Sequence, residues 1–350
     1  MAQRVYVGMS GGVDSSLTAA LLVERGYDVT GVYMKNWTQD LPGMRCPWAD
    51  DLADAKRVAV QLGIDFKVFD FEREYRQKVV DYMIEEYKLG RTPNPDIMCN
   101  QEVKFKLFLD AALEDGADLI ATGHYARVEQ SDERGILRLA EDTNKDQTYF
   151  LYRVTGGALA KTLFPLGEYT KPDVRKMAEE RGLFTAGKKD SQGICFVGQI
   201  GIREFLSQYV ETLPGDIIDT QTNKKLGRHD GAIFYTLGQR HGLDVGGGLP
   251  YYVVGKDMDK NEVYVSTNLN DTSIWNNQIT LAHVHWINDA PADGVYTVRI
   301  RHRAQLVRAT LHYRDDRVVL VLDDAQRAIA AGQSVVIYDG EVCLGGGIVY

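Results

Sequence analysis

Short apolar runs and helix-type repeats alternate along the first 200 residues of the chain. The run Val5-Tyr6-Val7 predicts a strand, and the apolar stretch that starts at residue 17 predicts a helix ending at Gly26. Further strands are predicted at residues 28–34, 66–70 and 119–122, and further helices at residues 50–62, 72–89, about 100–113 and 171–181. Repeated strand–helix units of this kind favour an α/β fold with a doubly wound parallel sheet, which binds ligands outside the carboxyl ends of its strands.

The pattern changes beyond residue 205 to short strands separated by turns rich in Gly, Asp and Asn. An early hairpin is predicted at residues 126–139. Short strands follow at residues 217–218, 232–235, 251–254 and 262–266, and longer alternating strands at 280–286, 295–303, 305–313, 317–322 and 334–338. The short strands predict a small β-rich central domain and the longer ones a compact antiparallel barrel. We therefore expect three domains, at residues 1–204, 205–275 and 276–350.

Composition narrows the class of protein. No apolar stretch approaches the roughly 20 residues of a membrane span, and the N-terminus runs directly into the first strand, so we expect a cytoplasmic protein. A net charge of −9 disfavours nonspecific binding to nucleic acid but leaves room for local basic patches. The 4 cysteines include no Cys-x-x-Cys pair, which argues against a clustered metal site and against a disulfide scaffold.

The turn after the first strand carries the strongest chemical signal. Its sequence is Gly8-Met9-Ser10-Gly11-Gly12-Val13-Asp14-Ser15-Ser16. A glycine-rich turn between a strand and a helix directs backbone N–H groups and a helix N-terminus toward one point, which suits an anion such as phosphate. Asp14 can hold a magnesium-bound water or cap the turn. The turn is neither a Walker A loop, because it lacks Gly-Lys-Ser/Thr, nor a Gly-x-Gly-x-x-Gly fingerprint. An ordinary βα turn is the simpler alternative.

Two of the cysteines lie in polar loops. Cys99 follows Asn94-Pro95-Asp96, near the start of a helix that we expect Asn100 to lead, and a helix N-terminus lowers the pKa of a thiol. Cys195 follows Lys188-Lys189 and has glycines on both sides. Their surroundings alone are equally consistent with two unrelated buried cysteines. Cys46 and Cys343 are expected to be structural.

Several separate motifs, in one order, resemble the bacterial tRNA-specific 2-thiouridylase family of the PP-loop ATP pyrophosphatase superfamily. They are Ser10-Gly11-Gly12-Val13-Asp14-Ser15, Asn94-Pro95-Asp96 with Cys99-Asn100, Thr122-Gly123-His124-Tyr125, Lys145-Asp146-Gln147, Gly193-Ile194-Cys195-Phe196, Thr236-Leu237-Gly238-Gln239-Arg240 and Gly345-Gly346-Gly347. The resemblance covers nearly the whole chain. It implies a PP-loop ATP-binding catalytic domain with tRNA-contacting insertions in residues 1–204.

The resemblance also implies a reaction. ATP adenylates the C2 oxygen of the wobble uridine of tRNA, and a cysteine persulfide then replaces the activated oxygen and releases AMP. Cys195 would carry the persulfide, supplied by a persulfide carrier or cysteine desulfurase. Cys99 would attack the persulfide to free sulfide, or form a disulfide with Cys195 after transfer. Asp96 would be a general acid or base, although it is equally suited to a capping role.

Binding residues follow from the same resemblance. ATP, with Mg²⁺, would be bound by Gly8, Met9, Ser10, Gly11, Gly12, Val13, Asp14, Ser15, Met34 and Gly123. The tRNA would be bound by Asn94, Pro95, Asp96, His124, Lys145, Asp146, Gln147, Arg301 and His302. A base in a stacked anticodon loop must be extruded to be reached. A second basic cluster, Lys171, Arg175, Lys176, Lys188 and Lys189, would contact phosphates.

Some of these positions have simpler alternatives. Met34 on a strand is commonly a core residue, and His124 can pack at a strand end. The family more often has tyrosine at the position of His302, and residues 301–303 can instead form a solvated strand face.

Two other functions of the protein are also compatible with the glycine-rich loop. One is a PP-loop synthetase that forms an amide from a small adenylated substrate and needs no cysteine. The other is a nucleotide-binding module without catalysis.

Overall fold

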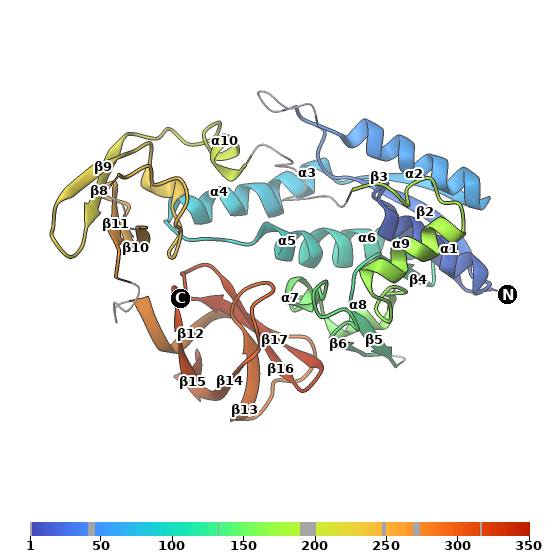
Figure 1. Ribbon diagram of the computed structural model, residues 1–350. Coiled ribbons are helices and arrows are strands. Elements are labelled where there is room, and N and C mark those ends of the chain that lie inside the picture. Colours follow the sequence, from blue (N-terminus) through green and yellow to red (C-terminus); the bar gives the residue numbers. More distant parts are fainter. Residues whose placement is uncertain are drawn as a thin grey trace.

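The computed structural model describes residues 2–40, 46–131, 133–189, 201–246, 250–268, 274–315 and 317–350. The first part of the chain forms a layered α/β domain, at one end of which lies the N-terminus (Figure 1). A small β-rich domain and a barrel follow along the chain, and both lie beside the long helices of the first domain (Figure 1). The predicted fold class is confirmed.

The first domain is built on a parallel sheet with the strand order β3-β2-β1-β4-β7. Its strands are β1 (Arg4–Gly8), β2 (Asp28–Lys35), β3 (Asp65–Asp70), β4 (Leu119–Ala121) and β7 (Thr162–Leu163). Helices α1 (Val13–Glu24) and α2 (Trp48–Leu62) pack against β1, β2 and β4 in one apolar cluster. Helix α9 (Lys171–Glu180) packs against α1 in another. The ends of β1, β2 and β4 therefore meet at one edge of the sheet, as predicted.

Two long helices cover the opposite face of the sheet. The first comprises α3 (Glu72–Tyr75), the π-helical η1 (Arg76–Val80) and α4 (Asp81–Lys88). The second comprises α5 (Pro95–Met98), the π-helical η2 (Cys99–Leu107) and α6 (Phe108–Glu114). Apolar side chains of both pack on β1, β2 and β4 in the largest core cluster. The first helix agrees with the prediction, and the second begins earlier than predicted.

The start of the second helix corrects the sequence analysis. Asn94, not Asn100, is the N-cap, because its side-chain oxygen accepts hydrogen bonds from the N–H groups of Asp96 (3.1 Å) and Ile97 (3.4 Å). Pro95 then occupies the first turn, where its missing N–H costs nothing. Cys99 consequently lies one turn inside the helix, at the junction between α5 and the π-helical segment. Asn100 instead donates to the carbonyl of Phe150 (3.0 Å).

The predicted hairpin is present as β5 (Arg127–Gln130) and β6 (Gly135–Arg138). It does not stand alone, because β6 pairs with the last strand of the barrel through Arg138 with Val342 and Leu137 with Cys343. Two short helices follow, α7 (Thr148–Leu151) and α8 (Gly156–Ala160). The first domain and the barrel thus share one continuous sheet.

The central domain contains a four-stranded sheet with the order β10-β11-β8-β9. After α10 (Ile202–Leu206), its elements are β8 (Gly215–Asp219), β9 (Lys225–His229), η3 (Ala232–Phe234), β10 (Tyr252–Asp257) and β11 (Glu262–Ser266). The predicted strand at residues 232–235 is wrong. These apolar residues are buried as a 3₁₀ turn that follows Gly231 at a φ of 155°, and the strand beside it is the polar β9.

The C-terminal domain is a closed antiparallel barrel. Its strands are β12 (Trp275–Trp286), β13 (Gly294–Arg299), β14 (Val307–Arg314), β15 (Arg317–Arg327), β16 (Ser334–Asp339) and β17 (Val342–Val349). The sheet closes because β12 pairs with both β15 and β17. Alternate apolar side chains from these strands fill the interior.

The three domains meet at the loop that precedes the second long helix. The N–H of Thr92 donates to the carbonyl of Ala331 in the barrel (3.0 Å), and the Thr92 hydroxyl lies 3.2 Å from that of Thr236 in the central domain. Farther along this helix, Gln101 accepts a hydrogen bond from Arg153 (2.5 Å), which also donates to the carbonyl of His283 in the barrel (2.8 Å). The helix that carries Cys99 is therefore fixed relative to the barrel. Among the described residues, no helix is both long and apolar enough to cross a membrane.

Candidate functional site

The glycine-rich turn joins β1 to α1 at the edge of the parallel sheet. Gly11 has a φ of +74°, a conformation that L-residues with side chains rarely adopt. A Cβ atom at this position would lie 2.4 Å from the carbonyl oxygen of Asp51 on α2, so the loop is pressed against α2. Gly12 is the N-cap of α1, and within the described part of the chain no side chain caps the N-terminal N–H groups of this helix. Such groups are available to an anion.

The serine side chains of the turn form hydrogen bonds within it. The Ser15 hydroxyl accepts a hydrogen bond from the N–H of Ser10 (3.2 Å) and donates to the carbonyl of Gly12 (3.2 Å). The Ser16 hydroxyl donates to the same carbonyl (2.7 Å). The hydroxyls of Ser10 and Ser15 lie 3.4 Å apart. These hydrogen bonds support the conformation of the turn.

Asp14, in the first turn of α1, is paired with a lysine that the sequence analysis assigned to a different role. The ammonium of Lys171 lies 2.6 and 2.8 Å from the two carboxylate oxygens, and the Tyr125 hydroxyl donates to one of them (2.8 Å). Lys171 is buried, with only a tenth of its side chain exposed, which places it outside any exposed basic cluster. A pairing between residues 157 positions apart gives no signal in the sequence.

Two residues expected beside adenine and ribose lie against the same turn. A Cβ atom on Gly123 would lie 2.9 Å from the carbonyl carbon of Asp14 and from the nitrogen of Ser15. A Cβ atom on Gly8 would lie 2.9 Å from the terminal methyl group of Met34. Met34 therefore borders the strand end of the turn, and Gly123 borders its helix end. The structure brings together all of the residues predicted for nucleotide binding.

The second part of the site is the start of the helix that carries Cys99. Cys99 is 6% exposed and belongs to the main core cluster. Burial raises the pKa of the nearby Asp96 carboxyl, and the charge of Lys104 partly opposes this shift. A carboxyl with a raised pKa stays protonated to a higher pH than usual, which suits a proton donor.

Lys104 is a residue that the sequence analysis missed. It lies in the π-helical segment η2. Its positive charge offsets part of the rise in the pKa of Asp96 and adds to the fall in the pKa of His124. It therefore lies near both groups. A π-helical turn is frequent at functional sites and shifts the direction of later side chains, so helical spacing in the sequence could not place this lysine.

His124 is buried at the end of β4 rather than presented at the surface. Its ring nitrogen Nδ1 lies 2.8 Å from the Thr122 hydroxyl, and the ring packs between Phe105 and Phe164 at 5.6 and 6.0 Å. Burial, with the charge of Lys104, holds the pKa of His124 well below its usual range, so the imidazole is neutral. Contact with tRNA stays a prediction for this residue, which is 8% exposed in this conformation.

The segment Lys145-Asp146-Gln147 precedes α7. Asp146 is buried and forms an ion pair with Arg299 of the barrel (2.5 Å). The side-chain oxygen of Gln147 accepts from the N–H of Tyr125 (2.9 Å), next to the nucleotide turn. Within this segment, the side chains of Asp146 and Gln147 thus support the fold in this conformation. A direct contact with tRNA remains a prediction for all three residues.

The barrel contributes a loop that faces α7. The His302 ring lies 4.4 Å from the ring of Phe150, and burial lowers the pKa of His302. Arg301 is exposed and donates to the carbonyl of Arg327 (2.8 Å). Since Asn100 also bonds to Phe150, a path of direct contacts leads from the neighbour of Cys99 to the barrel.

Cys195 and its neighbours at residues 190–200 lie outside the described residues, so its predicted approach to Cys99 has no test here. Lys188, which precedes them, forms ion pairs with Asp51 (2.8 Å) and Asp54 (2.7 Å) on α2. Arg175 donates to the carbonyl groups of Ala186 and Lys188. Of the predicted basic cluster, Lys176 and Lys189 are exposed.

The two remaining cysteines are buried, and burial raises the pKa of both thiols. Cys46 donates to the carbonyl of Trp37 (3.6 Å), and Cys343 lies in β17. A buried thiol with a raised pKa is a poor nucleophile at neutral pH. This placement fits the structural role expected for Cys46 and Cys343.

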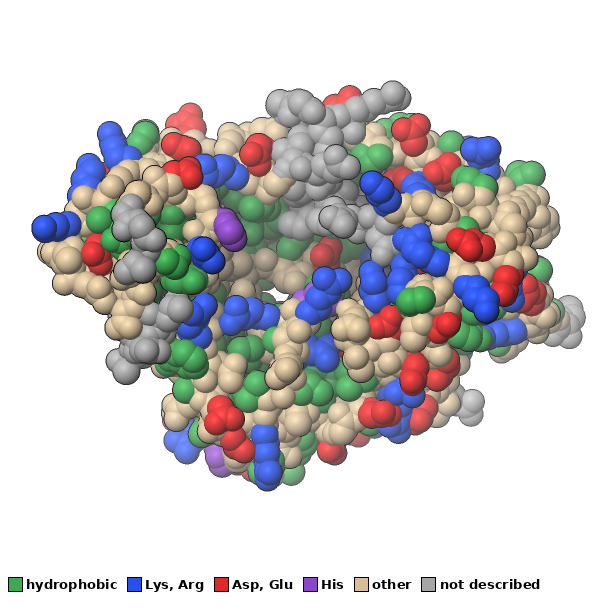
Figure 2. Space-filling view, in the orientation of Figure 1, with side chains coloured by type: hydrophobic (Ala, Val, Ile, Leu, Met, Phe, Trp, Pro, Cys, Tyr) green, Lys and Arg blue, Asp and Glu red, His purple; other side chains and the backbone are tan. Residues whose placement is uncertain are grey.

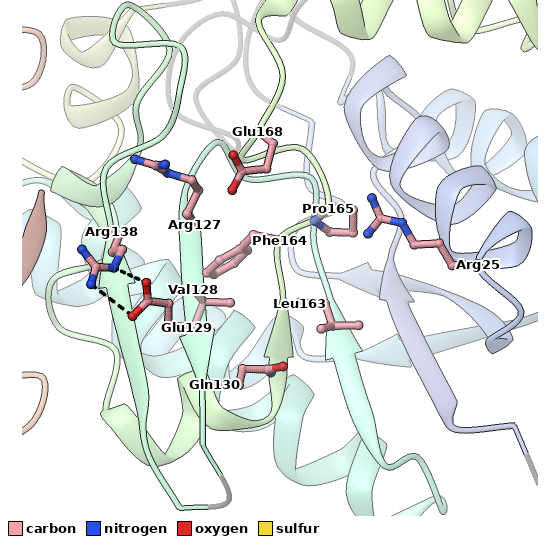
Figure 3. A pocket seen from close by; sticks show the side chains of 10 residues that line it. All are labelled: Arg25, Arg127, Val128, Glu129, Gln130, Arg138, Leu163, Phe164, Pro165 and Glu168. Carbon is pink, nitrogen blue, oxygen red and sulfur yellow. Dashed lines mark hydrogen bonds and ion pairs between the residues drawn. The ribbon is translucent and has the colours of Figure 1, made fainter.

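The molecular surface has two distinct hollows that concern the site. Figure 2 shows a deep hollow in the middle of one face, with Lys and Arg side chains around its rim. A second pocket lies between the hairpin and β7, and its lining includes Arg127, Phe164 and Glu168 (Figure 3). The Arg127 guanidinium points away from Glu168 and donates to the Leu139 carbonyl and to Glu341. Arg138 and Glu129 of this pocket pair with each other at 2.7 Å (Figure 3). The lining of this second pocket contains none of the residues predicted for nucleotide or tRNA binding.

Comparison with protein families divides the chain into three matched regions. Residues 3–199 match the family described as tRNA methyl transferase HUP domain. Residues 203–267 match the tRNA methyl transferase PRC-barrel domain, and residues 276–349 match the Aminomethyltransferase beta-barrel domain. Together, the three matches cover most of the chain in the order of its three folded parts.

Individual curated proteins match over almost their whole length. The tRNA-specific 2-thiouridylase MnmA 2 of Geobacillus kaustophilus (strain HTA426) is 47% identical over 350 residues, which cover 99% of this chain and 94% of the relative. The tRNA-specific 2-thiouridylase MnmA of Bacillus velezensis is 48% identical over 353 residues, with the same two coverages. A solved 4-thiouridine synthetase–RNA complex with bound ATP is more distant, with 17% identity, a TM-score of 0.39 and coverage of 59% of this chain and 50% of that one.

Proposed function

The chain belongs to the tRNA-specific 2-thiouridylase family, and from this premise we propose that it replaces the C2 oxygen of the wobble uridine of tRNA with sulfur in a reaction driven by ATP. The observation that supports this most is the identity of 47–48% across 99% of the chain. The site agrees with it, because a phosphate-binding turn and a helix bearing an acid and a cysteine occur in one domain. The cytoplasmic location remains a prediction.

The glycine-rich turn is the proposed binding site for the triphosphate. Its backbone N–H groups and the N-terminus of α1 favour negative charge, and Gly11 lets the chain approach a phosphate closely. Attack of the uridine C2 oxygen on the α-phosphorus breaks the bond to the bridging oxygen, whose electron pair leaves with pyrophosphate. Positively polarised groups of the turn stabilise that developing charge.

Magnesium fits this site only in part. No group of three or more His, Cys, Asp or Glu residues among those described could hold a metal. Asp14 is the carboxylate of the turn, and it is already paired with Lys171. Mg²⁺ prefers one or two carboxylates together with phosphate oxygens and water, so Asp14 would hold it only jointly with the nucleotide. When bound, the ion would neutralise phosphate charge.

Sulfur transfer is assigned to the two loop cysteines. The terminal sulfur of a persulfide on Cys195 attacks C2 of the adenylated base, and the C2 oxygen leaves on AMP. The Cys99 thiolate then attacks the inner sulfur of Cys195, which leaves 2-thiouridine and a Cys99–Cys195 disulfide; alternatively, Cys99 attacks earlier and frees sulfide. After the disulfide route, a thiol reductant must first reduce the Cys99–Cys195 disulfide, and a sulfur-donor protein then restores the persulfide on the free Cys195 thiolate. Asp96, whose raised pKa favours its protonated form, serves as the proton donor near the base.

Pyrophosphate release tests this proposal. With unmodified tRNA that contains a wobble uridine, the protein should release pyrophosphate from ATP. A matched tRNA that differs only by a purine at the wobble position should release none above background. Equal release with both tRNAs would exclude the proposed site of adenylation.

A further inference from the structure

Helices α1 and α9 run side by side in the same direction. Lys171 at the start of α9 pairs with Asp14 at the start of α1, and Arg181 after the end of α9 pairs with Glu24 at the end of α1 (2.7 Å). Leu17 and Leu21 of α1 pack against Val174 and Ala178 of α9 between the two ion pairs. The N-termini of both helices therefore meet at the nucleotide turn.

Several contacts fix the start of α9 in this position. Thr170 and Asp173 form a capping box, and the backbone N–H of Lys171 donates to Asp142 (2.9 Å). The ammonium of Lys171 also lies 5.7 Å from the centre of the Tyr125 ring, whose hydroxyl bonds to Asp14. The lysine side chain is 10% exposed and the Asp14 side chain 33% exposed. Lys171 thus lies beneath a carboxylate that solvent can reach.

A cation at this position needs an anion nearby, and the Asp14 carboxylate supplies one in this conformation. A helix dipole opposes a cation in the first turn of the helix, and Lys171 is the first residue of α9. The nucleotide turn itself contains no Lys or Arg between residues 8 and 16, although phosphate-binding loops commonly use a lysine. The ammonium beside Asp14 supplies this missing charge from a distant part of the sequence.

On these grounds, and resting on the proposed function, we propose that Lys171 binds the β- and γ-phosphates of ATP and stabilises the pyrophosphate leaving group. Lys171 lies beside Asp14 at the helix end of the turn, where the N-terminus of α1 is proposed to hold phosphate. Gly123 borders the same end of the turn, and Met34 borders the strand end at Gly8. Asp14 pairs with this ammonium in the structure, and we expect phosphate oxygens of ATP to take up the same ammonium when the nucleotide binds. No proton is transferred, because the ammonium acts by its charge and hydrogen bonds.

Calorimetry with the full-length protein tests this role without tRNA. Lys171→Gln should weaken the binding of ATP and of pyrophosphate by about tenfold or more, the effect of losing one charge-assisted hydrogen bond, and leave AMP binding within about twofold. Lys171→Arg should restore most of the affinity for pyrophosphate. Arg181→Gln is the matched control, because it removes the other ion pair between the same helices, and it should change none of the three affinities.

Two outcomes would overturn the proposal. Unchanged affinities for ATP and pyrophosphate in Lys171→Gln would exclude a phosphate contact. An equal loss of AMP, ATP and pyrophosphate binding would show that the lysine only supports the turn through Asp14. If Lys171→Gln does not fold, acylation of the wild-type protein decides: pyrophosphate should protect Lys171 from acetic anhydride and AMP should not, and equal labelling with both ligands would contradict the proposal.

These experiments separate the lysine from the overall reaction. If the protein binds pyrophosphate through Lys171 but forms no 2-thiouridine on any tRNA, the proposed function fails and the lysine assignment stands. If 2-thiouridine forms at the wild-type rate in Lys171→Gln, the lysine assignment fails and the proposed function stands.

Discussion

Asp146 and Arg299 form a buried ion pair between the catalytic domain and the barrel, with 2.5 Å between Oδ2 and Nη1. Their side chains are 1% and 9% exposed. Asp146 also accepts hydrogen bonds from the Thr148 hydroxyl (2.8 Å) and from the N–H of Ala140 (3.0 Å). The segment that the family resemblance assigns to tRNA binding is therefore fixed against the barrel by its central residue.

We predict that Asp146→Ala destabilises the protein. It leaves Arg299 buried without its charge partner, which typically costs about 3–5 kcal/mol. Urea unfolding should show this loss as a lower midpoint. The control is Asp323→Ala, which removes the exposed pair with Arg308 and should cost less than about 1 kcal/mol. Similar losses in both variants would show that the buried pair does not hold the two domains together.

Gly11→Ala should disable the nucleotide turn. The new methyl group would clash with the Asp51 carbonyl, and a φ of +74° is strained for alanine. We expect ATP affinity to fall by at least about tenfold, since 1.4 kcal/mol of strain is already tenfold. Gly157→Ala in α8 is the control, because no atom lies within 4 Å of the new Cβ. ATP binding at wild-type strength by Gly11→Ala, measured by calorimetry, would refute this role.

Asp96→Asn should separate activity from stability. Burial raises the pKa of Asp96 above its ordinary 3.8, so the folded protein binds more protons than the unfolded chain just above that pH. The free energy of unfolding contributed by this group is therefore present at low pH and is lost as the pH rises through the raised pKa. Asparagine cannot ionise, so the variant should gain stability relative to wild type between acidic and neutral pH.

The same variant should lose thiolation by about 100-fold or more if Asp96 is the proton donor. Urea unfolding across the pH range and rates of thiolation measure the two effects. Asp110→Asn is a control on the exposed face of the same long helix. Loss of stability in Asp96→Asn at neutral pH, with unchanged thiolation, would assign Asp96 to capping or packing instead.

Cys99→Ser should abolish thiolation while ATP and tRNA binding persist, because a hydroxyl cannot replace a thiolate in sulfur transfer. Cys343→Ser gives the contrast: that thiol is buried in β17 and its pKa is raised, so the variant should lose stability but keep thiolation once folded. Multiple-turnover formation of 2-thiouridine by Cys99→Ser would contradict the assignment.

The corresponding test at Cys195 is the Cys195→Ser variant, for which we also expect no thiolation.

The sequence predicted the elements whose pattern is local. The alternation of strands and helices up to residue 122 and the glycine-rich turn follow from short-range rules, and the structure confirms them. Prediction from the sequence failed where burial or pairing with a distant strand determines the secondary structure. The apolar residues Ala232–Phe234 form a turn, and the polar strand β9 is present because β8 pairs with it.

The candidate site shows the same division. Met34 borders the glycine-rich turn at Gly8 and Gly123 borders it at Asp14 and Ser15, as predicted, because the ends of parallel strands share one edge. The partners of charged residues were not predictable. Lys171 joins Asp14, and Asp146 joins Arg299, across more than 150 positions, and tertiary packing alone brings these residues together.

Isotope transfer from the base to AMP tests the central claim directly. Unmodified tRNA with ¹⁸O at C2 of the wobble uridine is incubated with the protein, ATP, magnesium and a sulfur donor, and both the nucleosides and AMP are analysed by mass spectrometry. The account predicts 2-thiouridine together with an equal amount of AMP that carries one ¹⁸O. Formation of 2-thiouridine with unlabelled AMP, or labelled tRNA that stays unchanged while ATP is consumed, would contradict it.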